Sequence, residues 1–287
     1  RAVVACILRR PPPVAIVAAT AAVAVTSLEV LFILRARRPG SRWSSQVGFP
    51  GGHMEMGEND TDAVVRECHE ELGLQLDDQH QFNYLGKIRD RTTGGGTDVV
   101  VACHLYEHLT PAVGVGIPAS SLQVSEVAGC GWTPLTALTS DRFLETLSWG
   151  ADDDFEKEQE RLASGASGAN GASEASGAGG RASGASEASG KEKDVPHHPE
   201  WNGFPSVRLP CLPNNFVVSD VSSISEEKKC RENFILWGLT LSMINDLLLT
   251  TELRSSPIDN NAVERAQQQQ QERNMAEKGD GGKFSRI

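Results

Sequence analysis

The chain has 287 residues, an apolar fraction of 39% and a formal net charge of −11. The length and apolar content suffice for a buried core, whereas the acidic excess argues against a broad nucleic-acid-binding face, because such a face neutralises many phosphates with basic side chains. A tract rich in glycine, alanine and serine lowers the effective globular length, so we expect one domain with insertions rather than two independent domains.

The six cysteines lie far apart and form no C-x-x-C pair, which indicates reduced, partly buried thiols of an intracellular protein rather than a zinc or redox centre. The sequence begins with Arg1 instead of methionine, so we interpret it as a fragment or a processed form. The final residues Ser285, Arg286 and Ile287 weakly resemble a peroxisomal targeting tripeptide. A peroxisomal or mitochondrial location therefore stays open beside a cytoplasmic one.

Two apolar segments near the start are expected to be buried strands, at residues 1–8 and 28–35. Residues 14–34 reach the length of a membrane span, with Glu29 as the one charge. This stretch follows three prolines and is rich in alanine and valine. We therefore favour a strand with an apolar insert over a membrane anchor, and we expect no membrane partner.

A helix is predicted from about Thr61 to Leu72, behind a loop rich in glycine and proline. Gly73 is expected to end this helix, and Asp60 or Thr61 to cap its beginning. Strands are predicted at residues 82–88 and 98–106 and around residues 129–132. Strands on both sides of a central helix predict an α/β fold with a mixed sheet between helices.

The second half of the chain alternates between low complexity and order. Residues 165–190 repeat Gly-Ala-Ser units, which cannot bury enough apolar surface to offset the entropy of ordering. Residues 204–209 are expected to be extended and residues 235–249 to form a closing helix. We predict four parts: the first part of the domain at 1–150, a disordered insert at 151–200, a closing strand and helix at 201–255, and a polar tail at 256–287.

The segment GHMEMGENDTDAVVRECHEELGL, residues 52–74, concentrates carboxylates on one side of the predicted helix. Glu67, Glu70 and Glu71 fall at i, i+3 and i+4, so all three project from one face. Three like charges this close repel one another, and a cation among them would relieve the repulsion. Hard oxygen ligands at this density suit Mg²⁺ or Mn²⁺, which could neutralise a diphosphate and lower the pKa of an attacking water.

Three glutamates alone would be an ordinary solvated face, so the complete spacing decides the interpretation. The segment matches the Nudix box, Gly-x5-Glu-x7-Arg-Glu-U-x-Glu-Glu-x-Gly-U with U apolar. A chance match to seven such fixed positions is on the order of one in a hundred million per starting position. The matching residues are Gly52, Glu58, Arg66, Glu67, Glu70, Glu71, Gly73 and Leu74.

The chain resembles Nudix hydrolases beyond the box as well. The segment LEVLFILRARRPGSRWSSQVGFPGG before it, and FNYLGKIRD, SEVAGCGWTPLTAL and FILWGLTLSMINDLL after it, are similar to the coenzyme A diphosphatase-like subgroup. The resemblance implies a Nudix α/β/α sandwich with a mixed central sheet. It also implies a Mg²⁺- or Mn²⁺-dependent hydrolase that cleaves the diphosphate of nucleoside diphosphate derivatives.

The substrate implied by this subgroup is coenzyme A or an acyl ester, giving 4′-phosphopantetheine and adenosine 3′,5′-bisphosphate. Trp43 and Ser45 stand where the stricter coenzyme A signature has a histidine and a glycine. ADP-ribose or a dinucleotide therefore stays open as substrate. An inactive Nudix scaffold that binds nucleotides or protein partners is the alternative from a different functional class.

The resemblance implies a metal site built on the helix. Glu67 and Glu71 would be the principal ligands, and Glu70 would lie beside them as a further ligand or catalytic group. A backbone carbonyl at Gly51 or Gly52 could add another oxygen, since glycine lets the backbone come close.

Three charged residues are expected to support this metal site. Arg66 would orient the carboxylates through a salt bridge, preferably to Glu58. Glu58 could instead complete the metal shell. Glu126 is the candidate for a supplementary metal ligand or general base, because Nudix enzymes often draw that group from outside the box. A simple exposed glutamate is the other interpretation.

A local basic cluster precedes the box and is the candidate for substrate binding. Arg35, Arg37, Arg38 and Arg42 could hold the 3′-phosphate of coenzyme A, or they could form a solubilising turn. Trp43 could stack on an adenine or be a buried core residue. We therefore expect a small-molecule nucleotide as partner, and a homodimer stays open.

Overall fold

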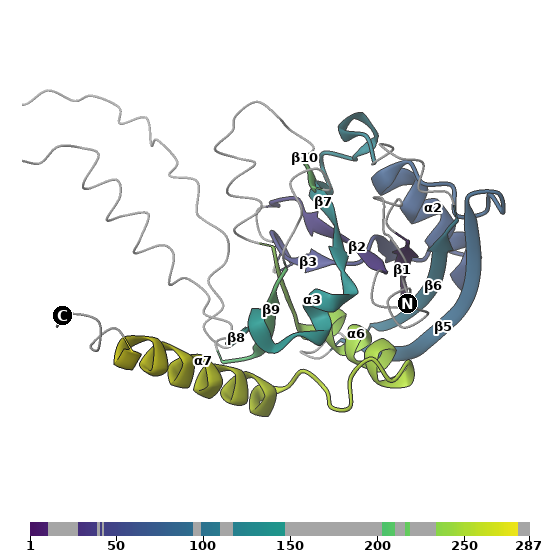
Figure 1. Ribbon diagram of the computed structural model, residues 1–287. Coiled ribbons are helices and arrows are strands. Elements are labelled where there is room, and N and C mark those ends of the chain that lie inside the picture. The colour runs from purple at the N-terminus through teal and green to yellow at the C-terminus, as the bar shows by residue number, and fades with distance from the viewer. Residues whose placement is uncertain are drawn as a thin grey trace, which may run out of the picture.

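A mixed sheet between helices forms the body of the protein, as the computed structural model shows (Figure 1). The strands of this main sheet are β1 (Ala2–Arg9), β2 (Glu29–Arg35), β3 (Val47–Gly48), β4 (Gly51–His53), β5 (Phe82–Thr92), β6 (Val100–His108), β7 (Val127–Pro134) and β10 (Phe216–Val218). The α-helices are α2 (Asp60–Leu72), α3 (Leu135–Thr139), α6 (Gly238–Thr250) and α7 (Asn260–Asp280). The structure describes residues 1–10, 28–38, 41, 43–93, 99–109, 117–146, 203–209, 216–218 and 234–280.

The main sheet has the strand order β10-β7-β2-β1-β6-β5, with β3 paired to β2 and β4 paired to β1. Strands β1 and β6 are parallel, whereas β1 and β2, β2 and β7, and β5 and β6 are antiparallel. The predicted mixed sheet is therefore confirmed. The three strands expected after the helix correspond to β5, β6 and β7.

Both faces of the central strands are buried, which explains their nearly continuous apolar sequences. Successive side chains of a strand point to opposite faces. Ala5 and Ile7 of β1 therefore pack in one cluster with Val64 and Cys68 of α2, while Cys6 packs in a second cluster with residues of α6. The sheet thus lies between α2 and α6, in agreement with the predicted α/β/α sandwich.

A second, three-stranded sheet lies beside the main one and was not predicted. Its strands are β8 (Leu144–Thr146), β9 (Pro205–Arg208) and β11 (Ile235–Trp237), in the order β11-β9-β8. The extended segment expected at residues 204–209 is β9. The prediction of a helix at residues 235–249 is wrong for the first three residues, which form β11 and pair with β9. Short apolar runs fit strands and helices equally well, and Gly238 with φ 61° separates the two elements here.

The beginning of the predicted polar tail belongs to the core. Ile258, Ala262 and Val263 are buried, and the side-chain amide of Asn245 bonds to both backbone groups of Ile258. The boundary predicted at residue 255 therefore lies too early. Beyond this contact α7 continues away from the body as a polar helix, and residues 267–271 are exposed (Figure 1).

The stretch considered as a membrane anchor overlaps strand β2, which confirms the favoured strand there and contradicts a helix. Glu29 begins β2 and lies buried beside Arg9 of β1, with the guanidinium Nε 2.7 Å from the carboxylate. Within the described ranges, no helix is long and apolar enough to span a bilayer. The rest of the apolar insert, and the predicted disordered insert at 151–200, lie outside the described residues.

Candidate active site

The helix that carries the glutamates of the box, α2, has a well-defined beginning and end. The side chain of Asn59 accepts hydrogen bonds from the backbone N–H groups of Thr61 and Asp62, so Asn59 is the N-cap. The expected cap at Asp60 or Thr61 is therefore wrong by one or two positions, because the asparagine side chain competes well for this role. Gly73 ends the helix with φ 71°, in the left-handed conformation that glycine adopts without strain.

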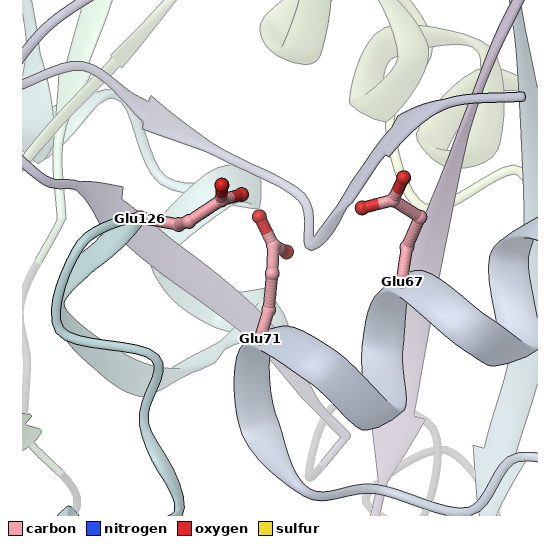
Figure 2. Close-up of side chains that lie close together, drawn as sticks. All are labelled: Glu67, Glu71 and Glu126. Atoms are coloured by element: carbon pink, nitrogen blue, oxygen red, sulfur yellow. The ribbon is translucent and has the colours of Figure 1, made fainter.

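Three glutamates converge from two separate parts of the chain. Glu67 and Glu71 lie one turn apart on α2, and Glu126 reaches toward them from the loop before β7 (Figure 2). One carboxylate oxygen of each lies within 4.8 Å of the others. Glu67 is 8% exposed and Glu71 only 1%. Buried like charges this close are costly unless a cation neutralises them, so the arrangement suits a divalent metal ion.

The backbone of β4 forms one wall of this cluster. The N–H of Gly51 donates to Glu71 Oε2 at 2.8 Å. A Cβ atom at Gly52 would lie 2.5 Å from both carboxylate oxygens of Glu67, which is shorter than any real contact. A side chain at position 52 would therefore displace the Glu67 carboxylate from its place against this strand.

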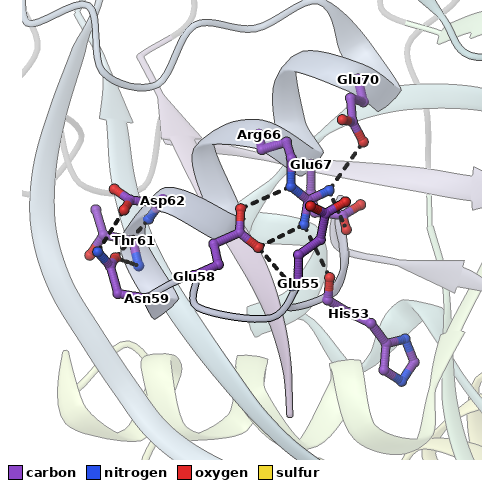
Figure 3. A network of polar contacts seen from close by, with 9 residues as sticks. All are labelled: His53, Glu55, Glu58, Asn59, Thr61, Asp62, Arg66, Glu67 and Glu70. Atoms are coloured by element: carbon purple, nitrogen blue, oxygen red, sulfur yellow. Dashed lines mark hydrogen bonds and ion pairs between the residues drawn. The ribbon is translucent and has the colours of Figure 1, made fainter.

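Arg66 lies at the centre of a polar network beside the cluster (Figure 3). Its Nε and Nη2 donate to the two oxygens of Glu58 at 2.9 and 3.0 Å, so the predicted ion pair is present. Its Nη1 donates to Glu67 at 3.0 Å and to Glu70 at 3.2 Å, and its Nη2 also donates to the carbonyl of His53. The guanidinium thereby fixes the orientation of three carboxylates.

Two of the candidate ligands lie outside the group of three converging carboxylates. Glu58 faces Arg66 and accepts a hydrogen bond from the N–H of Glu55, and its pKa is lowered mainly by Arg66. The side chain of Glu70 is 54% exposed and contacts Arg66 from the solvent side. Glu58 therefore supports Arg66, while Glu70 is accessible to a bound substrate.

Burial dominates the protonation of the two helix glutamates. It raises the pKa of Glu71 to about 8, although the Gly51 N–H and the charge of Arg35 oppose the shift. The pKa of Glu67 is also raised by burial, against the opposing effect of Arg66. A cation at this place would compete with a proton for these oxygens.

The raised pKa of Glu71 predicts that the metal-free protein loses stability as the pH rises from about 4.5 to about 8. Over this window the folded state holds a proton that the unfolded state, with an ordinary pKa of 4.5, has already released, so raising the pH favours unfolding. Urea unfolding in a chelator at pH 5 and pH 8 measures this slope. Glu71→Gln should flatten the slope, and identical slopes in both proteins would exclude Glu71 as its origin.

Glu126 also contacts a basic residue of the loop after β2. Arg38 donates through Nη2 to Glu126 Oε1 and through Nε to the carbonyl of Ser125 at 2.9 Å. Sequence reasoning placed Arg38 only in a general basic cluster. No local pattern could have revealed this contact, because its two partners lie 88 positions apart.

The other candidate substrate-binding residues lie on or near the same loop. Arg35 is partly buried at the end of β2 and is near enough to Glu71 to influence its pKa. Arg37 is exposed, and Arg42 lies outside the described residues. Trp43 is 43% exposed, so its interpretation as a buried core residue is wrong.

Comparisons with known proteins found one family and several solved structures. The model of the NUDIX domain matches residues 16–153. Similar solved structures are an Ap4A hydrolase from C. elegans (18% identity, TM-score 0.33, covering 47% of this chain and 81% of that one) and the Nudix hydrolase RenU from M. smegmatis (18%, 0.32, 57% and 85%). A third is the NUDIX domain of Shewanella oneidensis NrtR with ADP ribose (17%, 0.33, 56% and 86%). No curated protein matches the chain.

The matched residues include the complete box and all three converging glutamates. Residues 16–153 therefore match a NUDIX domain, which is the domain that the spacing of the box predicts.

Proposed function

We propose that the protein cleaves the diphosphate of a small nucleoside diphosphate derivative with the help of Mg²⁺ or Mn²⁺. The observation that carries this proposal is the convergence of Glu67, Glu71 and Glu126 within 4.8 Å, two of them buried. A scaffold without activity would gain nothing from holding repelling charges together. This argues against the alternative of an inactive binding protein.

The residues present suit a hard divalent cation. Glu67, Glu71 and Glu126 offer only carboxylate oxygens, and within the described part of the cluster no thiol or imidazole is among them. These three residues would hold the ion, with a carbonyl of Gly51 or Gly52 as a possible further oxygen. When bound, the ion would neutralise the charge of the diphosphate and favour deprotonation of an attacking water.

The chain's own residues orient the reacting groups around this site. Arg66 holds Glu67 and Glu70 in fixed directions, and Glu58 holds Arg66. The exposed Glu70 and the loop residue Glu126 are our candidates for the group that accepts a proton from the attacking water. Preorganised charges of this kind stabilise a phosphoryl-transfer transition state without reorganisation during the reaction.

For the substrate, we propose coenzyme A or an acyl-coenzyme A, with ADP-ribose or a dinucleotide as the second candidate. The similarity of the flanking segments to coenzyme A diphosphatases supports the first candidate. The partly buried Arg35 and the exposed Arg37 supply positive charge beside the cluster, with Arg42 as a third candidate. The exposed indole of Trp43 offers a surface on which an adenine could stack.

We expect activity to require Mg²⁺ or Mn²⁺ and to vanish in excess EDTA, because the three glutamates supply oxygen ligands for a divalent cation that would neutralise the diphosphate. Purified protein is incubated with the metal and a panel of coenzyme A, ADP-ribose, NADH and diadenosine polyphosphates, and the products are separated by chromatography. Return of activity when metal is added in excess of EDTA is the control for irreversible damage. Full turnover in EDTA would contradict the mechanism, and inactivity towards every compound would favour the scaffold.

A further inference from the structure

Each of the three converging carboxylates is held from outside by a different donor. Glu67 accepts from the guanidinium of Arg66, and Glu71 accepts from the backbone of Gly51. Glu126 accepts from the guanidinium of Arg38. The first two donors lie in or beside the Nudix box, whereas Arg38 lies well before it and has no role in the proposed function so far.

The guanidinium of Arg38 donates hydrogen bonds to two residues of the loop that carries Glu126. One guanidinium nitrogen donates to the Glu126 carboxylate and another to the carbonyl of Ser125, while the N–H of Ala36 donates to the carbonyl of Glu126 at 2.7 Å. The segment that follows β2 is thereby joined to the segment that precedes β7. The Arg38 and Glu126 side chains are 44% and 35% exposed, so the pair itself contributes little to the free energy of unfolding. Its effect is on the direction of the carboxylate.

The backbone of Arg38 is itself anchored by a buried hydroxyl. Ser44 is 2% exposed, and its Oγ accepts from the N–H of Arg38 at 2.9 Å and donates to the Arg38 carbonyl at 2.7 Å. One hydroxyl can make both bonds, since it is both donor and acceptor. The same carbonyl also accepts from the N–H of Ser41. Arg38 is therefore fixed at both backbone groups and at its guanidinium.

We propose that Arg38 is a positioning residue that holds the Glu126 carboxylate toward Glu67 and Glu71, with Ser44 fixing Arg38. The proposal rests on the proposed function, because it concerns the same three carboxylates. Glu126 stands on a loop and is repelled by two neighbouring carboxylates, so without the guanidinium it would turn toward water. The metal ion would then lose one oxygen ligand. Partners that orient metal ligands typically change metal affinity by 10- to 100-fold.

The affinity of the full chain for Mn²⁺ tests this role of Arg38. Electron paramagnetic resonance measures it through the signal of the free ion. The proteins compared are the wild type, Arg38→Gln, Glu126→Gln and the double variant. We expect Arg38→Gln to weaken Mn²⁺ binding about tenfold. In the double variant the affinity should equal that of Glu126→Gln alone, because Arg38 acts only through Glu126. Arg38→Lys should restore part of the loss, since one ammonium can reach Glu126 but cannot also reproduce the fork.

A matched ion pair elsewhere provides the control. Arg208 lies 3.2 Å from Glu145, and the two side chains are 51% and 32% exposed, which is close to the exposure of the Arg38 pair. Both residues lie in the second sheet, away from the cluster. Arg208→Gln should leave Mn²⁺ affinity within about twofold of the wild type, as expected for a surface pair.

Kinetics separate positioning from direct contact with the substrate. Arg38→Gln should lower kcat about tenfold and raise the Mg²⁺ concentration for half-maximal rate, with the substrate KM nearly unchanged. A raised KM with unchanged metal dependence, or an Arg38→Gln loss that persists in the Glu126→Gln background, would overturn the inference. Wild-type protein that binds no Mn²⁺ would overturn the proposed function. Wild-type binding with unchanged Arg38→Gln affinity would overturn this inference alone.

Discussion

Glu71→Gln is expected to lower turnover at least about a hundredfold while the protein stays folded. The substitution keeps the shape of the side chain and can still accept the hydrogen bond from Gly51, but it removes the charge that a metal ion needs. Because Glu71 is 1% exposed and lies near Glu67 and Glu126, removing its charge also relieves repulsion. We therefore expect the metal-free variant to be more stable at pH 8, by roughly 2 to 4 kcal/mol.

Rate and melting temperature together decide the outcome for Glu71. Glu264→Gln on the exposed face of α7 is the matched control, and it should change neither the rate nor the melting temperature measurably. Near-normal turnover of Glu71→Gln would refute its assignment as a metal ligand. A fall in melting temperature without added metal would refute the expected relief of repulsion.

Gly51→Ala is expected to destabilise the fold by about 3 kcal/mol or more and to abolish activity. Gly51 has φ 144°, which alanine rarely adopts, and an added Cβ would lie 2.2 Å from the carbonyl oxygen of Val3 and 2.7 Å from the Cα of Val4. These contacts are backbone atoms of the paired strand β1, so they cannot move without separating β4 from the sheet. The hydrogen bond to Glu71 would be lost with them.

Gly57→Ala separates backbone conformation from steric contact. Gly57 also has positive φ, 87°, but a Cβ there would meet no atom within 4 Å. Its substitution should cost only about 1 kcal/mol in urea unfolding, with activity retained. Equal losses of unfolding free energy in Gly51→Ala and Gly57→Ala would show that the close approach of Gly51 to β1 does not determine the effect of the substitution.

The helix of the Nudix box could be predicted because its determinants are local. The spacing of Glu67 and Glu71 places them on one face wherever the helix packs, and Gly73 ends the helix through its own conformational freedom. Strands β1 and β2 could be predicted as well, because a short and nearly continuous apolar run is typical of a strand that is buried on both faces. The N-cap was missed by one or two positions, since several adjacent polar residues can fill that role.

The remaining parts depend on contacts between distant segments. Ile235–Trp237 forms β11 only because β9 lies beside it, and the sequence of those three residues fits a helix as well. The place of Glu126 beside Glu71 is set by the pairing of β2 with β7, and Arg38 reaches Glu126 through the same pairing. Such neighbours leave no periodic signal in the sequence.

The parallel pairing of β1 with β6 has a consequence for folding kinetics. In this pairing Ala2 lies opposite Val101 and Arg9 lies opposite His108. Strand β2 likewise pairs with β7, whose residues come about a hundred positions later in the sequence. The pairings of β1 with β6 and of β2 with β7 therefore form only after roughly a hundred further residues of chain have emerged from the ribosome, because closing so large a loop is slow. Until then β1 and β2 each have one strand edge without its long-range partner, and such edges favour association between nascent chains.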